Sequence, residues 1–211
     1  SFEGSNIEAL KADEPYVTNI NNYRGGTKFE LAQTNFITIG GEYKNYTSSW
    51  EGVSKQIFNS ISFGEELIKS NYYKKDLEKI LAIAKNDSEK IGLIFDFVKS
   101  KVKWNGYYGK YTGNGVRKAY KENSGNVADI NLMLTSMLRS SGLNAYPVLV
   151  SSRGNGVPLF PTLDGFDYVI SMVKFQDDSY VLLDASEFYS LPNVLTRRAL
   201  NWKGRVVTKN G

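Results

Sequence analysis

One segment of the sequence constrains the fold more than any other. Between Asn126 and Gly142, apolar residues point in nearly every direction around a helix, whereas a surface helix carries them along one stripe. Asn126 is a good N-cap, Asp129 completes an arrangement like a capping box, and Gly142 is placed to end the helix. A helix that is buried on most sides needs packing partners all round, so we expect it at the centre of the fold.

The residues on either side of this segment provide those partners. Before it, apolar residues recur at spacings of three and four and predict helices; after it the period falls to two and predicts strands. The expected helices begin at Ser48 or Ser49 (with Trp50, Val53, Ile57 and Ile61 on one face) and cover 77–84, 87–102 and 116–120. The expected strands cover 145–152, 167–175 and 180–184, with Asp177 to Ser179 as a hairpin turn and loops at 105–115 and 153–165. Helices, a central helix and an antiparallel sheet in this order indicate an α+β fold.

Residues 1–47 follow a different pattern. Alternating residues at 27–32 and 35–39 predict two strands, bounded by glycine pairs at 25–26 and 40–41. Two or three strands are too few for an independent domain. We therefore expect this segment to end a larger β-rich unit, or to pack onto the residues that follow it. The sequence begins at Ser1 without a methionine, and we expect it to come from a longer or processed chain.

Two residue types are missing from the chain. It contains no cysteine and no histidine, which excludes disulfides, thiolate nucleophiles, cysteine-ligated metals and the usual serine or cysteine hydrolase triads. Carboxylate, lysine or tyrosine chemistry, oxygen-ligated cations and binding without chemistry remain. We expect no cofactor and no metal site, because Asp177 and Asp178 suit a hairpin turn better than a calcium site.

The charge of the chain is modest and dispersed. There are 26 basic and 22 acidic residues, a net charge of +4, and no dense basic stripe, so we expect solvated surface charge (Arg197 and Arg198 included) and no nucleic-acid partner. The longest apolar run, 91–98, is interrupted by Asp96 and is far shorter than the ~20 residues that span a bilayer.

The order of several motifs resembles the transglutaminase-like superfamily, which has a papain-type core. The motifs are Trp104, a glycine-rich loop, Gly125-Asn126-Val127 opening the buried helix, Tyr146 to Val150, Gly165 to Ile170, and Val181 to Asp184. The resemblance covers about residues 48–190 and is strongest to bacterial members that follow a β-rich domain of unknown function. It implies a transglutaminase-like domain over 48–211, a preceding domain ending at 1–47, and a periplasmic or cell-envelope location.

The resemblance also implies where catalytic residues would lie. In the family a cysteine at the start of the buried helix, a histidine on the first strand after the loop and an aspartate on the next strand act together. These positions fall at Val127, Tyr168 and Asp184, so only the aspartate is retained and no catalytic set is intact. Thiol chemistry is therefore impossible, and the resemblance implies a pseudoenzyme.

Three functions remain open. A binding or scaffolding module would use Trp104, Tyr107, Tyr108, Tyr111 and Arg153 to hold a peptide, protein or glycan in the former cleft, although the tyrosines could equally pin the loop to the surface. An enzyme with a non-thiol mechanism would use Asp184 with Tyr168, or a relocated nucleophile such as Ser124. A purely structural domain would have a closed cleft. The oligomeric state and the ligand are left open.

Overall fold

The computed structural model describes residues 4–6, 9–11, 15–17, 19–25, 31, 33–34, 44–45 and 49–211. In the N-terminal part it shows a short 3-10 helix, η1 (Ile20–Asn22), and an antiparallel pair formed by β1 (Gln33–Thr34) and β2 (Lys44–Asn45). Apart from Leu31, the strands predicted at 27–32 and 35–39 lie outside the described residues.

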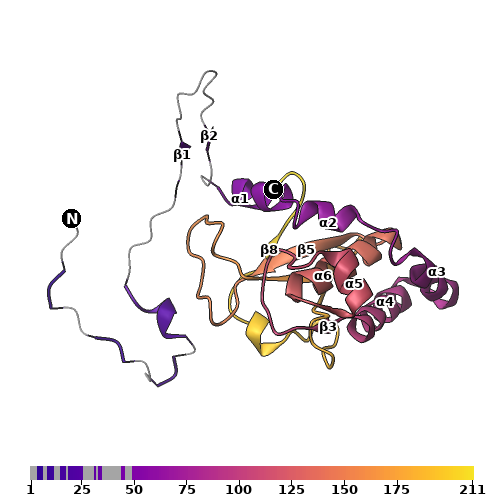
Figure 1. Cartoon of the computed structure of the whole chain (residues 1–211). Helices are drawn as coiled ribbons and strands as arrows, with labels where there is room; N and C mark the ends of the chain where they lie inside the picture. Colours follow the sequence, from indigo (N-terminus) through magenta and orange to yellow (C-terminus); the bar gives the residue numbers. More distant parts are fainter. Residues whose placement is uncertain are drawn as a thin grey trace, which may run out of the picture.

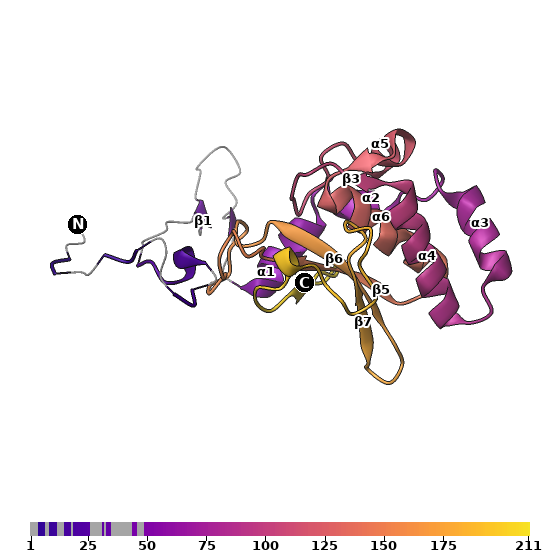
Figure 2. The same cartoon turned by 90° about the horizontal axis from the view of Figure 1, so that it is seen from below.

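The rest of the chain forms a helical layer and a sheet on opposite sides of one central helix (Figures 1 and 2). The helices are α1 (Trp50–Phe58), α2 (Gly64–Ile68), α3 (Lys74–Ile83), α4 (Asp87–Lys101), α5 (Val116–Glu122) and α6 (Val127–Ser140). The sheet contains β5 (Ala145–Val150), β6 (Tyr168–Lys174), β7 (Tyr180–Leu183) and β8 (Arg205–Val206), all antiparallel in the order β7-β6-β5-β8. The α+β prediction is confirmed. None of the helices in the described part of the chain is long and apolar enough to cross a membrane.

The central helix is α6, as its sequence predicts. Every residue from Val127 to Leu138 is buried, with α2, α4 and α5 on one side and β5 and β6 on the other. The Asn126 side chain accepts a hydrogen bond from the Asp129 N–H at 2.8 Å, and the Asp129 carboxylate accepts one from the Asn126 N–H at 2.9 Å, which completes the capping box. Gly142, with φ of 88°, lies just beyond the helix end in the left-handed region that suits glycine.

Several predicted boundaries were wrong. Helix α1 ends at Phe58, and Ile61, expected on its buried face, is 68% exposed. Strand β5 ends at Val150 because the Ser152 N–H donates to the Asp167 carboxylate at 2.6 Å and therefore does not take part in the pairing of β5 with β6. Five short elements carried no clear signal: α2, β8, the parallel pair β3 (Lys103–Trp104) and β4 (Ser124–Gly125), and the 3-10 helix η2 (Arg197–Ala199).

Candidate functional site

The short parallel pair β3–β4 sets Trp104 beside the beginning of α6. Trp104 lies opposite Gly125, and the Asn105 N–H extends the pairing by donating to the Gly125 carbonyl at 2.9 Å. A side chain at residue 125 would meet the Asp129 Cβ at 2.7 Å and the Ala119 Cβ at 3.0 Å. Glycine is therefore required where β4 passes into the helix.

Val127 opens α6 and is fully buried. Its N–H donates to the Tyr107 carbonyl at 3.3 Å, and the same carbonyl accepts the Trp104 indole N–H at 2.9 Å. The N-terminal end of the helix is thus covered by the 105–115 loop, and the position holds an aliphatic side chain without a nucleophilic atom.

One turn further along the same face of α6, Asn131 joins the helix to the sheet. Its amide nitrogen donates to the Val169 carbonyl and to the Asp184 carboxylate, both at 3.0 Å, while its amide oxygen accepts the Ala185 N–H at 2.9 Å. Residues four apart share a helix face, so Val127 lies on the side of α6 that faces Asp184 and β6.

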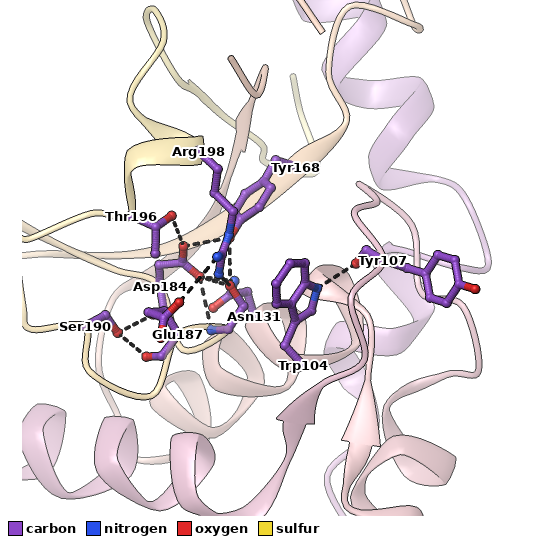
Figure 3. A network of polar contacts seen from close by, with 10 residues as sticks. Trp104, Tyr107, Asn131, Tyr168, Asp184, Glu187, Ser190, Thr196 and Arg198 are labelled. Atoms are coloured by element: carbon purple, nitrogen blue, oxygen red, sulfur yellow. Dashed lines mark hydrogen bonds and ion pairs between the residues drawn. The ribbon is translucent and has the colours of Figure 1, made fainter. Parts of the chain in front are cut away.

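Asp184 follows β7 and is the centre of a buried polar network (Figure 3). One carboxylate oxygen accepts from Asn131 at 3.0 Å, from the Ser186 N–H at 3.1 Å and from the Ser186 hydroxyl at 2.6 Å. The other accepts from the Tyr168 hydroxyl at 2.8 Å and from the Thr196 hydroxyl at 3.1 Å. With five donors around it, this carboxylate has no open side for a substrate.

Tyr168 begins β6 and is also fully buried. Its phenol oxygen lies 2.8 Å from Asp184 and 2.7 Å from the Ser186 hydroxyl, and it accepts a hydrogen bond from the Arg198 Nε at 3.0 Å. Burial and then the nearby Asp184 carboxylate raise the pKa of Tyr168 well above its usual value, against the opposing effect of Ser186 and Arg198. The phenol therefore keeps its proton at neutral pH and is a poor general base there.

Arg198 was predicted to be ordinary surface charge, and this prediction was wrong. Its side chain is 18% exposed, its guanidinium carbon lies 4.3 Å from the centroid of the Trp104 ring, and it donates to Tyr168 and, at 3.0 Å, to Ser186. Burial alone would lower the pKa of Arg198, but its bond to Tyr168 and the charges of Asp184 and Glu187 outweigh that effect and raise it. Arg198 is thus a cation held against a buried group of oxygen atoms.

The predicted aromatic residues divide into two groups. Trp104 and Tyr108 are stacked, with ring centroids 5.6 Å apart and an interplanar angle of 10°, and Tyr108 meets Tyr168 edge to face at 5.6 Å. Tyr107 is 73% exposed and only its backbone takes part in the contacts described above. Tyr111 is half-buried and its carbonyl accepts from the Asn126 side chain at 2.9 Å, so it holds the loop against the helix cap.

Tyr120, which is close to these aromatics in sequence, belongs elsewhere. Its ring packs against Tyr72, and its hydroxyl donates to Asp76. Closeness in sequence does not bring Tyr120 to Trp104, because α5 turns its side chain toward α3 and α4.

A hollow of about 530 Å³ lies next to the buried network. Six residues line it: Tyr108, Arg153, Glu187, Thr196, Arg197 and Arg198. A second hollow, of about 430 Å³, lies beside Trp104 and Ser186 and is lined by Lys99, by residues 102–104 and by residues 185–189. The position of Tyr168 is thus filled by buried side chains, and the two hollows lie beside it at the surface. Among the described residues, no three acidic side chains come together in a way that could hold a metal ion.

A model of the transglutaminase-like superfamily matches residues 75–185. The chain belongs to this superfamily. The matched segment of the transglutaminase-like domain contains Val127, Tyr168 and Asp184, whereas Thr196 and Arg198, which complete the polar network, lie beyond it.

The fold of the domain is also found in a solved structure. A crystal structure of a protein from Parabacteroides distasonis, named a putative protease, matches with a TM-score of 0.52 and 15% identity over 76% of this chain. The match spans 31% of the other chain, so the transglutaminase-like chain corresponds to less than a third of that protein. At this identity the similarity shows a shared fold. No curated protein matches the chain.

Sequence reasoning missed four residues of the network: Asn131, Ser186, Thr196 and Arg198. Asn131 carried a signal, since an amide inside an otherwise apolar, buried helix requires hydrogen-bond partners. The other three lie after β7, two in irregular segments and Arg198 in the one-turn helix η2, where no periodicity indicates which side chains point inward.

Proposed function

We propose that this transglutaminase-like domain is a catalytically inactive binding module. The observation that carries the proposal is the side chain at the start of α6, where a buried valine without a nucleophilic atom stands in a chain that has no cysteine or histidine. The proposal takes Val127, Tyr168 and Asp184 as the family's three catalytic positions, which follows from the resemblance and is supported by the contacts of Asn131 and Tyr168 with Asp184.

The buried network supports a structural role for these three positions. Tyr168 and Asp184 are inaccessible to a substrate, and the raised pKa of the phenol opposes a role as base. A hydrolase that uses Asp184 with Tyr168 would need an open approach to one of them, and the five donors around the carboxylate leave none. Ser124 lies in β4, two residues before the helix cap, and its hydroxyl has no carboxylate or lysine partner among the residues that the structure describes.

The binding role is proposed for the surface beside the network. The stacked pair Trp104 and Tyr108, with the exposed Tyr107, gives this surface aromatic faces, and the hollow lined by Tyr108 and Arg153 is open to a ligand. Aromatic faces next to hydrogen-bonding groups suit an extended peptide or a glycan. We also propose, from the resemblance to bacterial members of the family, that the domain belongs to a larger exported protein of the periplasm or cell envelope.

The catalytic half of the proposal is tested with a panel of amide and ester substrates. We expect no turnover by the wild-type domain and none by the Asp184→Asn variant. The matched control is Asp178→Asn, at an exposed carboxylate of the β6–β7 turn. If the wild-type domain turns over a substrate, and this activity is lost in Asp184→Asn but kept in Asp178→Asn, the domain is a non-thiol enzyme and the proposed binding module is wrong.

The binding half is tested by calorimetric titration of peptides and oligosaccharides into the domain. Tyr108→Leu should weaken binding of the ligands that bind, while Tyr180→Leu, at an exposed tyrosine at the start of β7, should leave binding unchanged. If no probe binds, the domain is structural and the proposal fails.

A further inference from the structure

The hollow beside the polar network has an unusual lining for its size. Three of its six residues are arginines, one is a glutamate, and the other two are Tyr108 and Thr196. No aliphatic side chain lines it, whereas most pockets for uncharged ligands are lined by apolar groups. Its charge therefore favours an anion.

Two of the arginines are held in place before any ligand arrives. Arg198 donates through Nε to Tyr168, through one terminal nitrogen to Ser186, and through the other to Glu187 at 3.4 Å. These contacts use three of its five N–H groups and leave two for a ligand. Arg153 is tied to the same segment, because its N–H donates to the Arg198 carbonyl at 3.1 Å and its Nε to the Leu200 carbonyl at 2.7 Å.

The terminal nitrogens of Arg153 have no partner within the described part of the chain, and neither does the guanidinium group of the exposed Arg197. Planar guanidinium groups bind carboxylates through paired N–H···O bonds. Because the surrounding contacts already restrict Arg153 and Arg198, a carboxylate that binds here orders fewer side chains than it would on an open surface.

The remaining lining indicates what carries the carboxylate. A peptide of apolar or mixed sequence would need an apolar pocket for an anchoring side chain, and this hollow has none. A sugar ring needs a flat aromatic face and polar groups for its hydroxyls. Tyr108 provides the face, and Glu187 and Thr196 provide acceptors at the same hollow, whose volume of about 530 Å³ is in the range of small-ligand pockets.

We propose that the arginine-lined hollow formed by Tyr108, Arg153, Glu187, Thr196, Arg197 and Arg198 binds an acidic oligosaccharide through the carboxylate of a uronic-acid residue. This inference rests on the proposed binding function and assigns it a ligand class. Arg153 and Arg197 bind the carboxylate together with the outward N–H groups of Arg198, and Tyr108 packs against the sugar ring.

The test uses calorimetry at low ionic strength with trigalacturonate as the probe. Its methyl ester is the neutral control and triglutamate is the peptide control of equal charge. We expect trigalacturonate to bind at least about tenfold more tightly than the methyl ester, since a charge-assisted hydrogen bond contributes about that factor or more. We expect it also to bind more tightly than triglutamate, which has carboxylates but no sugar ring to pack against Tyr108. Affinity should fall as salt is added.

Variants locate the site. Arg197→Gln and Arg153→Gln should each weaken trigalacturonate binding about tenfold, and Arg197 is the cleaner position because no contact within the described part of the chain depends on it. Arg117→Gln is the matched control: it removes an exposed arginine on α5 that is not part of the hollow and should change affinity less than about twofold. A circular dichroism spectrum of each variant checks that it is folded.

The outcomes separate this inference from the one on which it rests. Tighter binding of triglutamate, or equal binding of the methyl ester, would overturn the acidic-sugar assignment and leave the binding module standing. An equal loss in Arg117→Gln, or no loss in either pocket variant, would overturn the location. If neither these probes nor the peptides and neutral glycans bind, both proposals fail together.

Discussion

The Asp184 carboxylate offers the sharpest test of the buried network, because its two oxygens have different kinds of partner. Two of the three donors at one oxygen are N–H groups, from Asn131 and from the Ser186 backbone, which cannot accept a hydrogen bond. Both donors at the other oxygen are hydroxyls, from Tyr168 and Thr196, which can turn and accept. An asparagine at position 184 can therefore be accommodated in one orientation only.

That orientation sets the cost of the Asp184→Asn variant. With its oxygen toward Asn131 and its NH₂ toward the two hydroxyls, an amide keeps every polar atom paired. The carboxylate charge that helps hold the Arg198 guanidinium is lost, and a neutral hydrogen bond is weaker than one to a charged group. We expect the free energy of unfolding to fall by about 2 kcal/mol.

The Asp184→Leu variant should cost about twice as much. It fills the space but leaves five donors without their acceptor inside a dry site, and the two N–H groups cannot pair with each other. We expect a loss of about 4 kcal/mol, a large part of the roughly 5–15 kcal/mol by which a domain is stable.

Urea unfolding followed by tryptophan fluorescence measures both changes, provided that the slope of the transition stays constant. Asp178→Asn, at the exposed turn carboxylate that pairs with Lys174, is the control and should leave the midpoint almost unchanged. The reasoning is refuted if Asn and Leu at position 184 cost the same, because the network would then not depend on how its donors are satisfied.

Three further predictions concern other parts of the same site. A thiol introduced by Val127→Cys should resist labelling in the native state and react only at the rate of unfolding, because the side chain is 0% exposed; rapid labelling would show that the helix start is open. Tyr168→Phe should be less stable than wild type near neutral pH, with the difference narrowing by about 1.4 kcal/mol per pH unit above pH ~10 in urea titrations. The sign follows from the pKa of Tyr168, which is higher in the folded than in the unfolded protein. The protonated phenol stabilises the fold fully below the pKa of the unfolded protein, and this stabilisation is lost as the pH rises toward the pKa of the folded protein. A stability difference between Tyr168→Phe and wild type that does not change with pH would contradict this reasoning. Asn126→Ala removes the cap of α6 and the bond to the Tyr111 carbonyl, and should cost about 1–2 kcal/mol and speed proteolysis within 105–115; unchanged proteolysis would mean that the cap does not hold the loop.

Periodicity along the chain was sufficient to predict the central features of the fold. The buried helix, its capping box and the β6–β7 hairpin depend on contacts between residues that are close in sequence, so they were predicted nearly as observed. One boundary error has a clear physical cause. Asp167 ends β5 through a side-chain hydrogen bond to the Ser152 N–H, 15 residues away in sequence, and periodicity does not contain such a bond.

The candidate site was predicted only in part. A resemblance in motif order indicated Trp104, Val127, Tyr168 and Asp184, and the structure brings them to one region around the start of α6. The cation of that region was missed: Arg198 lies 30 residues beyond Tyr168 in the one-turn helix η2, and it was expected to face solvent. Its burial depends on long-range packing against Trp104.

The amino-acid sequence by itself determined which chemistry is impossible, because a chain without sulfhydryl or imidazole groups cannot form a thiolate–imidazolium pair in any conformation. It also determined the central helix, since the apolar character of that segment is a local property. Only the tertiary structure decided what occupies the space beside Tyr168. Whether an arginine from a distant loop turns inward depends on the oxygen atoms and the aromatic face that the completed fold presents to it, and these come from separate parts of the chain.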